Sequence, residues 1–239
     1  MISPIEYNAA WSKTCLRSPE IWYTWRILES YVKKAEKRLE IGAGMFPKFS
    51  VQGTYFLDTS LHAINELNKR GGKGVVKGAE EQLPFQKDFF DLIGAFEVLE
   101  HLKRPGRAIR EVAKTIKPGG LFILSVPMNP QYWSPWDVFA GHVQRFEPAQ
   151  LNALLEKEGF EVRHCYVVWK LAKKRVFSWF MRLAGSLPLH FPFFFFFLYN
   201  YAVIPYTWFG RTFSKSRHYS SLLGIPQDST CALVVCAKR

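Results

Sequence analysis

The chain has 239 residues, a mass of 27.7 kDa and a net charge of +12. Apolar residues make up 48% of it and charged residues 22%, a balance that supports a hydrophobic core and excludes collagen-like, coiled-coil and wholly disordered chains. The length suits one α/β domain with an elaboration, or two small domains. The charge is uneven, since residues 1–170 carry a net +4 and residues 171–239 a net +8. A basic, aromatic C-terminal region predicts an anionic partner, either a membrane surface or a polyanion.

Cysteine usage and the N-terminal residues bear on the compartment. The four cysteines form no C-x-x-C pair, which argues against a zinc knuckle or a redox motif. Residues 1–15 contain no basic segment followed by an apolar run, so we predict no signal peptide. The expected location is therefore the reducing cytoplasm.

Strands and helices are predicted to alternate along the first 170 residues. A helical lead-in is expected over residues 1–37, with a helix start at Ser18-Pro19-Glu20. Strands are expected at 38–41, 51–58, 74–78, 90–96, 121–126 and 160–169, with helices at 61–70, 108–116 and 149–158 and a further helix after the first strand. The last strand is expected at 230–237. Such alternation indicates βαβ units and a parallel sheet covered by helices on both faces.

The strongest local motif is Glu40-Ile41-Gly42-Ala43-Gly44, directly after the first predicted strand. Glycines at such a turn permit positive φ and a close approach of a ligand to the backbone. Dinucleotide-binding folds also use a G-x-G loop, but here Pro47 occupies the position of their third glycine. The carboxylate of Glu40 would repel a pyrophosphate and suits a cationic ligand.

Further blocks follow in a fixed order: Asp58 after the second strand, GAEEQLPF at 78–85, Phe90-Asp91, FEVLEHL at 96–102, KPGG at 117–120, HVQRF at 142–146 and EGF at 158–160. With these blocks the chain resembles the class I S-adenosylmethionine-dependent methyltransferases, in particular their type 11 branch and the ubiquinone-pathway O-methyltransferases. The resemblance covers roughly residues 36–170 and the last strand. It implies a Rossmann-like α/β fold, with a seven-stranded, mostly parallel sheet and an antiparallel last strand.

The resemblance also divides the chain. Residues 1–37 form the helical lead-in, 38–170 the core that binds S-adenosyl-L-methionine, 171–229 a hydrophobic helical insert and 230–239 the last strand of the core sheet. The cofactor contacts that it implies come from Glu40, Gly42, Ala43, Gly44, Asp58, Thr59, Ala79, Glu80, Phe96 and Glu97.

Each implied contact has a physical interpretation. The glycines would pack under the amino-acid part of the cofactor, Asp58 would bind the ribose hydroxyls and residues 79–81 would flank the adenine. Phe96 and Glu97 would lie under the methionine part. Two positions depart from the family, since Phe46 replaces a glycine and Ala79 replaces an aspartate. The alternative is that these residues serve only the tight turn, a helix cap and the core.

Methyl transfer from a sulfonium requires alignment and often a base, and His142 and His101 are the candidate bases. Glu97, Glu100 and His101 are expected to share one helical face. In the ubiquinone-pathway enzymes this spacing accompanies a divalent cation, but here we expect a cluster beside the cofactor without a metal. His142 is expected in a loop that closes over the substrate. A structural hydrogen bond to that loop is the alternative role for His142.

The predicted insert contains an apolar segment. Residues 183–210 include no Asp, Glu, Lys or Arg, and basic clusters flank them on both sides. Pro188, Pro192 and Pro205 interrupt any spanning helix, and the last strand must return to the sheet. We therefore expect an interfacial or re-entrant hairpin, with residues 171–217 on an anionic membrane at the inner face of the cell. The alternative is an apolar lid over the site, which could also serve as a dimer contact.

These features predict methyl transfer to an oxygen atom of a hydrophobic or lipid-linked acceptor. The second hypothesis is a catalytically weak, cofactor-binding scaffold at the membrane surface. No nucleic-acid partner is expected, because the basic residues flank an apolar segment rather than form a groove. The sequence gives no oligomeric state.

Overall fold

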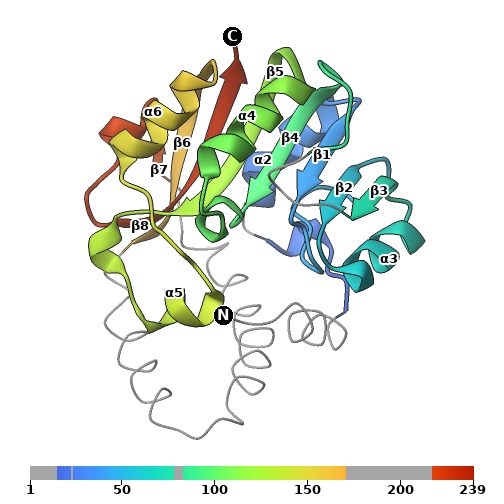
Figure 1. The fold of residues 1–239 in the computed structure, drawn as a ribbon, viewed down its shortest axis with the longest axis horizontal. Coiled ribbons are helices and arrows are strands. Elements are labelled where there is room, and N and C mark those ends of the chain that lie inside the picture. The colour runs from blue at the N-terminus through green and yellow to red at the C-terminus, as the bar shows by residue number, and fades with distance from the viewer. Residues whose placement is uncertain (1–14, 23, 78–82, 171–216) are drawn as a thin grey trace, which may run out of the picture.

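The computed structural model describes residues 15–22, 24–77, 83–170 and 217–239 (Figure 1). Within them, the strands form one eight-stranded sheet in the order β3-β2-β1-β4-β5-β8-β6-β7. Three predicted regions lie outside the described residues: the start of the lead-in at 1–14, the segment 78–82 and most of the insert, 171–216.

Five strands run parallel: β1 (Arg38–Ile41), β2 (Tyr55–Asp58), β3 (Lys73–Lys77), β4 (Phe90–Phe96) and β5 (Ile116–Pro127). The last strand, β8 (Ser229–Lys238), lies between β5 and β6 (Phe160–Lys170) and is antiparallel to both. Its register pairs Leu124 of β5 with Val234. The predicted mostly parallel sheet with an antiparallel last strand is confirmed.

The sheet has one strand more than predicted. A three-residue strand, β7 (Arg217–Tyr219), pairs antiparallel with the edge of β6. Beyond it, Leu222 and Ile225 are buried in the main core. Residues 217–229, assigned to the insert from the sequence, therefore contribute to the sheet and the core. Three residues are too few to show the alternation that identifies a strand in a sequence.

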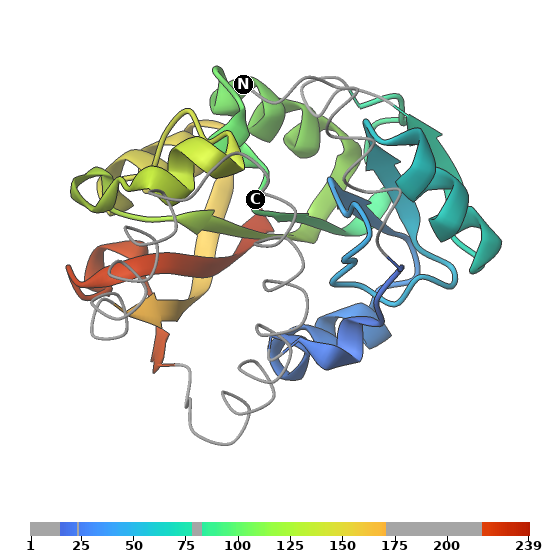
Figure 2. The ribbon, with the colours of Figure 1, turned by 90° about the horizontal axis from the view of Figure 1, so that it is seen from below.

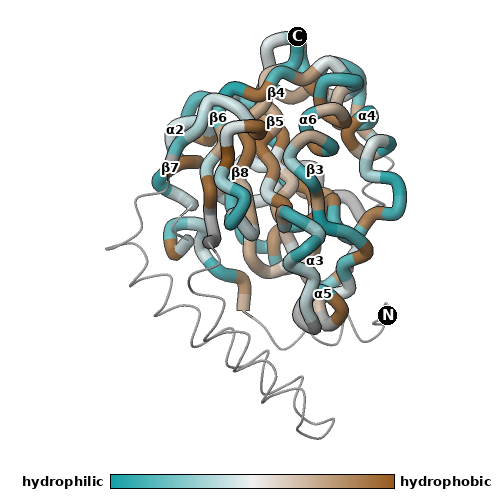
Figure 3. The backbone as a smooth tube through the Cα atoms, turned by 90° about the vertical axis from the view of Figure 1, so that its left-hand side faces the viewer, coloured by the Kyte–Doolittle hydropathy of each residue, from teal (hydrophilic) through white to brown (hydrophobic). Residues whose placement is uncertain are grey.

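Helices cover both faces of the sheet. The helices α4 (Pro105–Thr115) and α6 (Pro148–Lys157) cover one face, and α2 (Trp25–Lys34) covers the other (Figure 2). On the side of α2, α3 (Leu61–Lys69) packs on Phe56 of β2. The short helix α5 (Pro135–Ala140) and the 3-10 turns η1 (Pro19–Ile21), η2 (Leu99–His101), η3 (Pro130–Tyr132) and η5 (Leu222–Gly224) complete the elements. Figure 3 shows the hydrophobic residues concentrated along the central strands.

The helix predicted directly after β1 is absent. Residues 42–54 instead form an irregular connection, because Pro47 disfavours a helical Phe46 and cannot donate a helical hydrogen bond. Phe49 takes over the packing that such a helix would provide. Its ring is fully buried against Leu28 and Phe96, with ring centroids 5.6 Å apart in the aromatic pair.

Among the described helices, none has the length and apolar character needed to cross a bilayer.

Gly94 in β4 has no side chain, and the Phe49 ring packs into the space, here called the notch, that this leaves. A Cβ at Gly94 would lie 2.6 Å from Cζ of Phe49 and 2.7 Å from Cε2 of Phe96. We predict that Gly94→Ala lowers the free energy of unfolding by about 1–3 kcal/mol through overpacking. Phe49→Ala should lower the free energy of unfolding by about 3–5 kcal/mol. Without the Phe49 ring, Gly94→Ala should change it little, so the double variant should be about as stable as Phe49→Ala. Denaturant unfolding measures all three.

The matched control is Gly106→Ala in α4, where the added Cβ would meet only Leu154 at 3.4 Å. It should leave the free energy of unfolding unchanged or slightly increased. Additive effects of the substitutions at 49 and 94 would contradict this account of the notch.

Candidate active site

The carboxyl ends of β1, β2 and β4 lie next to one another, since these parallel strands are neighbours in the sheet. In Figure 1 they point toward the side of the molecule where α5 lies. Most of the residues predicted for the site follow these strand ends. In open α/β sheets this edge is where ligands bind.

Asp58, at the end of β2, is bonded directly to the glycine loop. Its Oδ2 accepts a hydrogen bond from the backbone N–H of Gly44 at 2.7 Å, and its Oδ1 accepts one from Ser60 at 2.7 Å. The backbone N–H of Gly42 donates to Leu57 at 2.8 Å, so the loop and the carboxylate lie together as the sequence predicts. Burial raises the pKa of Asp58, and the backbone donors act in the opposite direction. Each carboxylate oxygen keeps a lone pair for a further donor.

Gly42 is required by conformation and by packing. Its φ is +68°, and a Cβ there would approach Cγ2 of Val98 to 2.7 Å. Gly44 also has positive φ, +52°. The loop therefore packs directly against the Val98 side chain, in the segment that follows β4.

Glu40 stabilises the loop from within. The side chain is 1% exposed, and its carboxylate accepts the backbone N–H groups of Lys48 and Phe49, each at 2.8 Å. Burial raises the pKa of Glu40 to about 7, against the lowering effect of these two bonds. The Glu40 oxygens are thus bonded to the backbone of the loop that follows β1. Ala43, in the same loop, is buried.

Glu97 adopts a backbone conformation unusual for its residue type. Its φ is +55°, a left-handed value that costs about 1–3 kcal/mol outside glycine and occurs often at ligand sites. Its Oε1 accepts a hydrogen bond from Oγ of Ser125 at 2.7 Å. The expected shared helical face of Glu97, Glu100 and His101 is wrong, because the helical turn covers only Leu99–His101 and Glu97 precedes it.

Glu100 is a fully buried acid. Neither of its oxygens has a hydrogen-bond partner among the described residues, and the side chain is 0% exposed. Burial and the neighbouring Glu97 carboxylate together raise the pKa of Glu100 well above its ordinary value. These surroundings favour the protonated form of Glu100, which can donate its proton to a neighbouring acceptor.

His142 is held by an ionised carboxylate that the sequence analysis missed. Asp137 of α5 is buried, and its Oδ1 lies 3.0 Å from Nδ1 of His142. Burial alone would raise the pKa of Asp137, but the hydrogen bonds from His142 and from the guanidinium of Arg145 hold it well below its ordinary value. Arg145 makes a two-pronged contact with the carboxylate at 2.7 and 3.0 Å. An ionised Asp137 accepts only, so Nδ1 of His142 donates and Nε2 is left as the acceptor.

Asp137 escaped prediction because α5 has only six residues. The signal that could have located it is the spacing of Ser134 and Asp137, which form a capping box at the start of α5.

His101 lies beside His142, with ring centroids 5.0 Å apart. Its Nδ1 is 3.2 Å from the carbonyl oxygen of Gly141, so Nδ1 is the donor and Nε2 carries no proton in this tautomer. Burial and the neighbouring imidazole lower the pKa of His101. The ligand atoms of Glu100, His101 and His142 all lie within 4.8 Å of one another, a spacing at which a cation could be held. His142 thus stands in this set where the sequence pattern suggested Glu97.

The remaining predicted residues divide into two groups. Phe96 is buried at the end of β4, and Thr59 is exposed next to Asp58. Ala79 and Glu80, the predicted neighbours of the adenine, lie outside the described residues.

A family model described as a methyltransferase domain matches residues 35–165, more than half of the chain. The chain belongs to this methyltransferase family. The resemblance found in the sequence blocks is thereby confirmed, and the cofactor of this methyltransferase is S-adenosyl-L-methionine.

Curated relatives match parts of this methyltransferase. A protein of Encephalitozoon cuniculi assigned as a methyltransferase is 33% identical over 106 residues, 43% of this chain and 50% of that protein. The 2-methyl-6-phytyl-1,4-hydroquinone methyltransferase 1 of rice, Oryza sativa, is 31% identical over 32% of this chain and 24% of its own length. The ubiquinone biosynthesis O-methyltransferase of Aeromonas salmonicida is 30% identical over 29% of this chain and 30% of its own. The chain spans at most about half the length of these relatives.

Solved structures share the fold. An S-adenosylmethionine-dependent methyltransferase from Mesorhizobium loti superposes with a TM-score of 0.56 at 15% identity, covering 93% of this chain and 100% of that one. A methyltransferase structure from Galdieria sulphuraria superposes with a TM-score of 0.58 at 13% identity, covering 98% and 97%. At these identities the likeness shows the fold alone.

The residues present fit S-adenosyl-L-methionine. Asp58 retains lone pairs toward donors such as the ribose hydroxyls, and the loop itself presents no side chain at Gly42 or Gly44. Glu97, in its strained conformation, lies on the other side of β1 from Asp58. These residues would hold the ribose and the amino-acid part of the cofactor.

We predict that Glu40→Ala destabilises the fold. The N–H groups of Lys48 and Phe49 would lose their acceptor, at about 1–3 kcal/mol for each buried group. The free energy of unfolding should therefore fall by about 2–5 kcal/mol, measured by urea denaturation. The control Glu156→Ala, on an exposed position of α6, should change it by less than about 0.5 kcal/mol. Equal effects of the two substitutions would show that the Glu40 bonds do not stabilise the loop.

Proposed function

We propose that the protein transfers a methyl group from S-adenosyl-L-methionine to a hydroxyl oxygen of a hydrophobic or lipid-linked small molecule. The observation that carries this proposal is the pair formed by His142 and the ionised Asp137. A hydroxyl acceptor must lose its proton as the new bond forms, and a base prepared in this way is what that chemistry needs.

The bound cofactor supplies an electrophilic methyl group. His142 then receives the proton of the acceptor hydroxyl at Nε2, the nitrogen that Asp137 leaves free. Asp137 keeps the imidazole in the required tautomer and stabilises the imidazolium that forms. Arg145 keeps Asp137 ionised through two hydrogen bonds.

Glu100 and His101 support this assignment of the base. Oε1 of Glu100 lies 3.9 Å from Nε2 of His142. Because burial and the Glu97 carboxylate favour the protonated form of Glu100, a second negative charge beside the base is disfavoured. His101, whose pKa is lowered by burial, is a neutral second acceptor beside His142.

The surroundings of His142 support an apolar acceptor. Trp133 is 43% exposed, Val138 67% and Val143 46%, and all three belong to the segment around α5 that carries Asp137 and His142. The names of the rice and Aeromonas relatives point to prenylated ring acceptors, a chemistry that such a surface accommodates.

We predict that the protein transfers labelled methyl from S-adenosyl-L-methionine to an acceptor in a total lipid extract, so that label enters the organic phase. His142→Gln should reduce the rate about 10²–10⁴-fold, because the proton acceptor is lost. Binding of S-adenosylhomocysteine, measured by calorimetry, should stay unchanged in this variant. The control His164→Gln, on β6, should retain the rate.

Three results would contradict parts of the proposal. Label confined to water-soluble amines would exclude a hydrophobic hydroxyl acceptor. Full activity of His142→Gln would exclude the base. Cofactor binding without turnover on any extract would favour the alternative, a catalytically weak scaffold that binds the cofactor.

We further propose that residues 171–217 bring the enzyme to an anionic membrane surface, where a lipid acceptor resides. The support lies in the sequence: 28 residues without charge at 183–210, preceded by Lys173, Lys174, Arg175 and Arg182 and followed by Arg211, Lys215 and Arg217. Basic residues next to an anionic surface contribute about 1 kcal/mol each.

We predict that the full chain floats with vesicles containing phosphatidylglycerol and does so less with phosphatidylcholine alone. Changing Lys173, Lys174 and Arg175 to Glu should weaken binding at least about a hundredfold. The same changes at Lys69, Arg70 and Lys73, in and after α3, should have little effect. No flotation with either vesicle would leave an apolar lid as the role of the segment.

A further inference from the structure

We infer that the ammonium group of Lys48 binds the carboxylate of the amino-acid part of S-adenosyl-L-methionine. Neither the sequence blocks nor the comparisons assign a role to this residue. The inference rests on the cofactor assignment and is independent of the acceptor.

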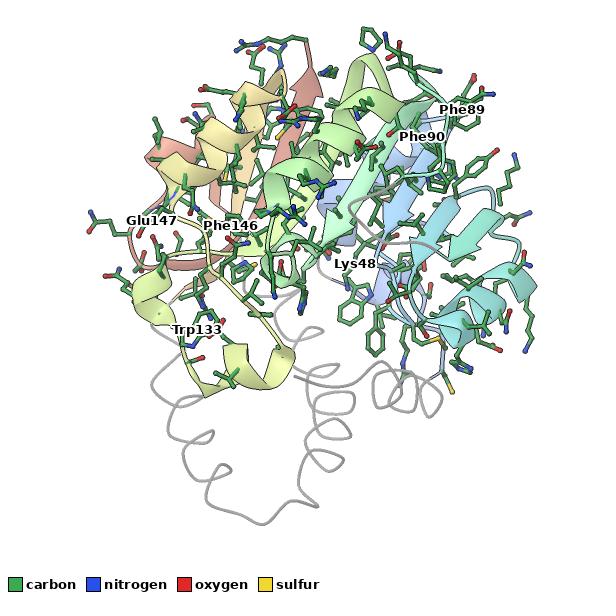
Figure 4. The ribbon with its side chains drawn as sticks, viewed as in Figure 1. Lys48, Phe89, Phe90, Trp133, Phe146 and Glu147 are labelled. Atoms are coloured by element: carbon green, nitrogen blue, oxygen red, sulfur yellow. The ribbon has the colours of Figure 1, made fainter. Side chains whose placement is uncertain are left out.

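Lys48 is held at the strand ends by its own backbone. Its backbone N–H donates a hydrogen bond of 2.8 Å to the carboxylate of Glu40, the residue two positions before Gly42. Its Nζ lies 3.4 Å from the centroid of the Trp22 ring, a cation–π contact that fixes the side chain. Trp22 in turn packs edge-on against Phe46 of the same loop, with centroids 5.8 Å apart. Figure 4 shows Lys48 near the carboxyl ends of β1 and β4.

The ammonium group lacks an anionic partner. No carboxylate of the described residues lies within 4.0 Å of Nζ in an ion pair, although Glu40 and Glu97 act on it from a greater distance. Removal from water lowers the pKa of Lys48 to about 8, while those two carboxylates raise it. A partly desolvated cation of this kind gains from a ligand carboxylate brought within hydrogen-bond reach.

The charges at the end of β4 match a zwitterion. Lys48 offers a positive group and Glu97 a negative one, and they are near neighbours that do not pair with each other. The amino-acid part of the cofactor carries one ammonium and one carboxylate, which complement Glu97 and Lys48.

The strand order gives the ligand its direction. Asp58 ends β2 and Glu97 follows β4, on opposite sides of β1. Two strand spacings separate them, about 10 Å, so a ligand lying across the end of β1 presents its ribose to one and its amino acid to the other. Glu97 is one of the two carboxylates that act on the Lys48 ammonium, so Lys48 lies near the end of the site that would receive the amino-acid part.

The test compares two ligands that differ only in that carboxylate: S-adenosyl-L-methionine and decarboxylated S-adenosylmethionine. Calorimetric titration of the full chain should show that the wild type prefers the first by about ten- to a hundredfold, the usual effect of a charged hydrogen bond. In Lys48→Gln the two ligands should bind with nearly equal Kd. Lys48→Arg should restore most of the preference, and Lys114→Gln, on α4, should leave it unchanged.

Each other outcome overturns the inference. Equal binding of both ligands by the wild type does so without any variant. Loss of affinity for both ligands by the same factor in Lys48→Gln assigns the residue a structural role only. If the wild type binds neither ligand, the cofactor assignment itself is wrong. This outcome differs from the others because it appears in the wild type and affects both ligands.

Discussion

Two buried carboxylates stabilised by backbone N–H groups determine the geometry of the site. Glu40 and Asp58 end neighbouring strands, are 1% and 2% exposed, and have no ion pair with a cation of the described residues. An unpaired buried charge is costly, so the donors that solvate it become essential. Here they come from Gly44, Lys48, Phe49 and Ser60. Because both ends of the connection are bonded in this way, the loop cannot move without leaving a carboxylate unsatisfied.

The same bonds explain how the sheet manages without a helix after β1. Glu40 accepts hydrogen bonds from two consecutive N–H groups, those of Lys48 and Phe49, whose side chains point to different parts of the structure. Phe49 fills the notch at Gly94 and completes the core beneath α2, whereas Lys48 extends toward Trp22 at the strand ends. One carboxylate thus positions a core residue and a residue of the site together.

Long apolar strands and glycine signals were predictable, whereas contacts made across the fold were not. The bounds of β4 agree with the prediction, because a short and mostly apolar run such as 90–96 is typical of a buried strand. The short elements α5 and β7 lack a period long enough to detect. The positive φ of Glu97 had no signal in its residue type, and the helical spacing of Glu97 and Glu100 was therefore misleading. Asp137 could not be paired with His142, because that contact depends on the turn after α5.

Two acids near His142 have pKa values shifted in opposite directions because their neighbours differ. Asp137 accepts from a guanidinium and an imidazole N–H, which favour its ionised form. Glu100 has no hydrogen-bond donor among the described residues and faces another carboxylate, which favours its protonated form. This division matters for the chemistry. An ionised acid on the Nε2 side would compete with the acceptor for the nitrogen that has to receive its proton. With neither ionised, the imidazolium formed during the reaction would lack a counter-charge. A single negative charge on the Nδ1 side satisfies both requirements, and Arg145 is the residue that keeps it there.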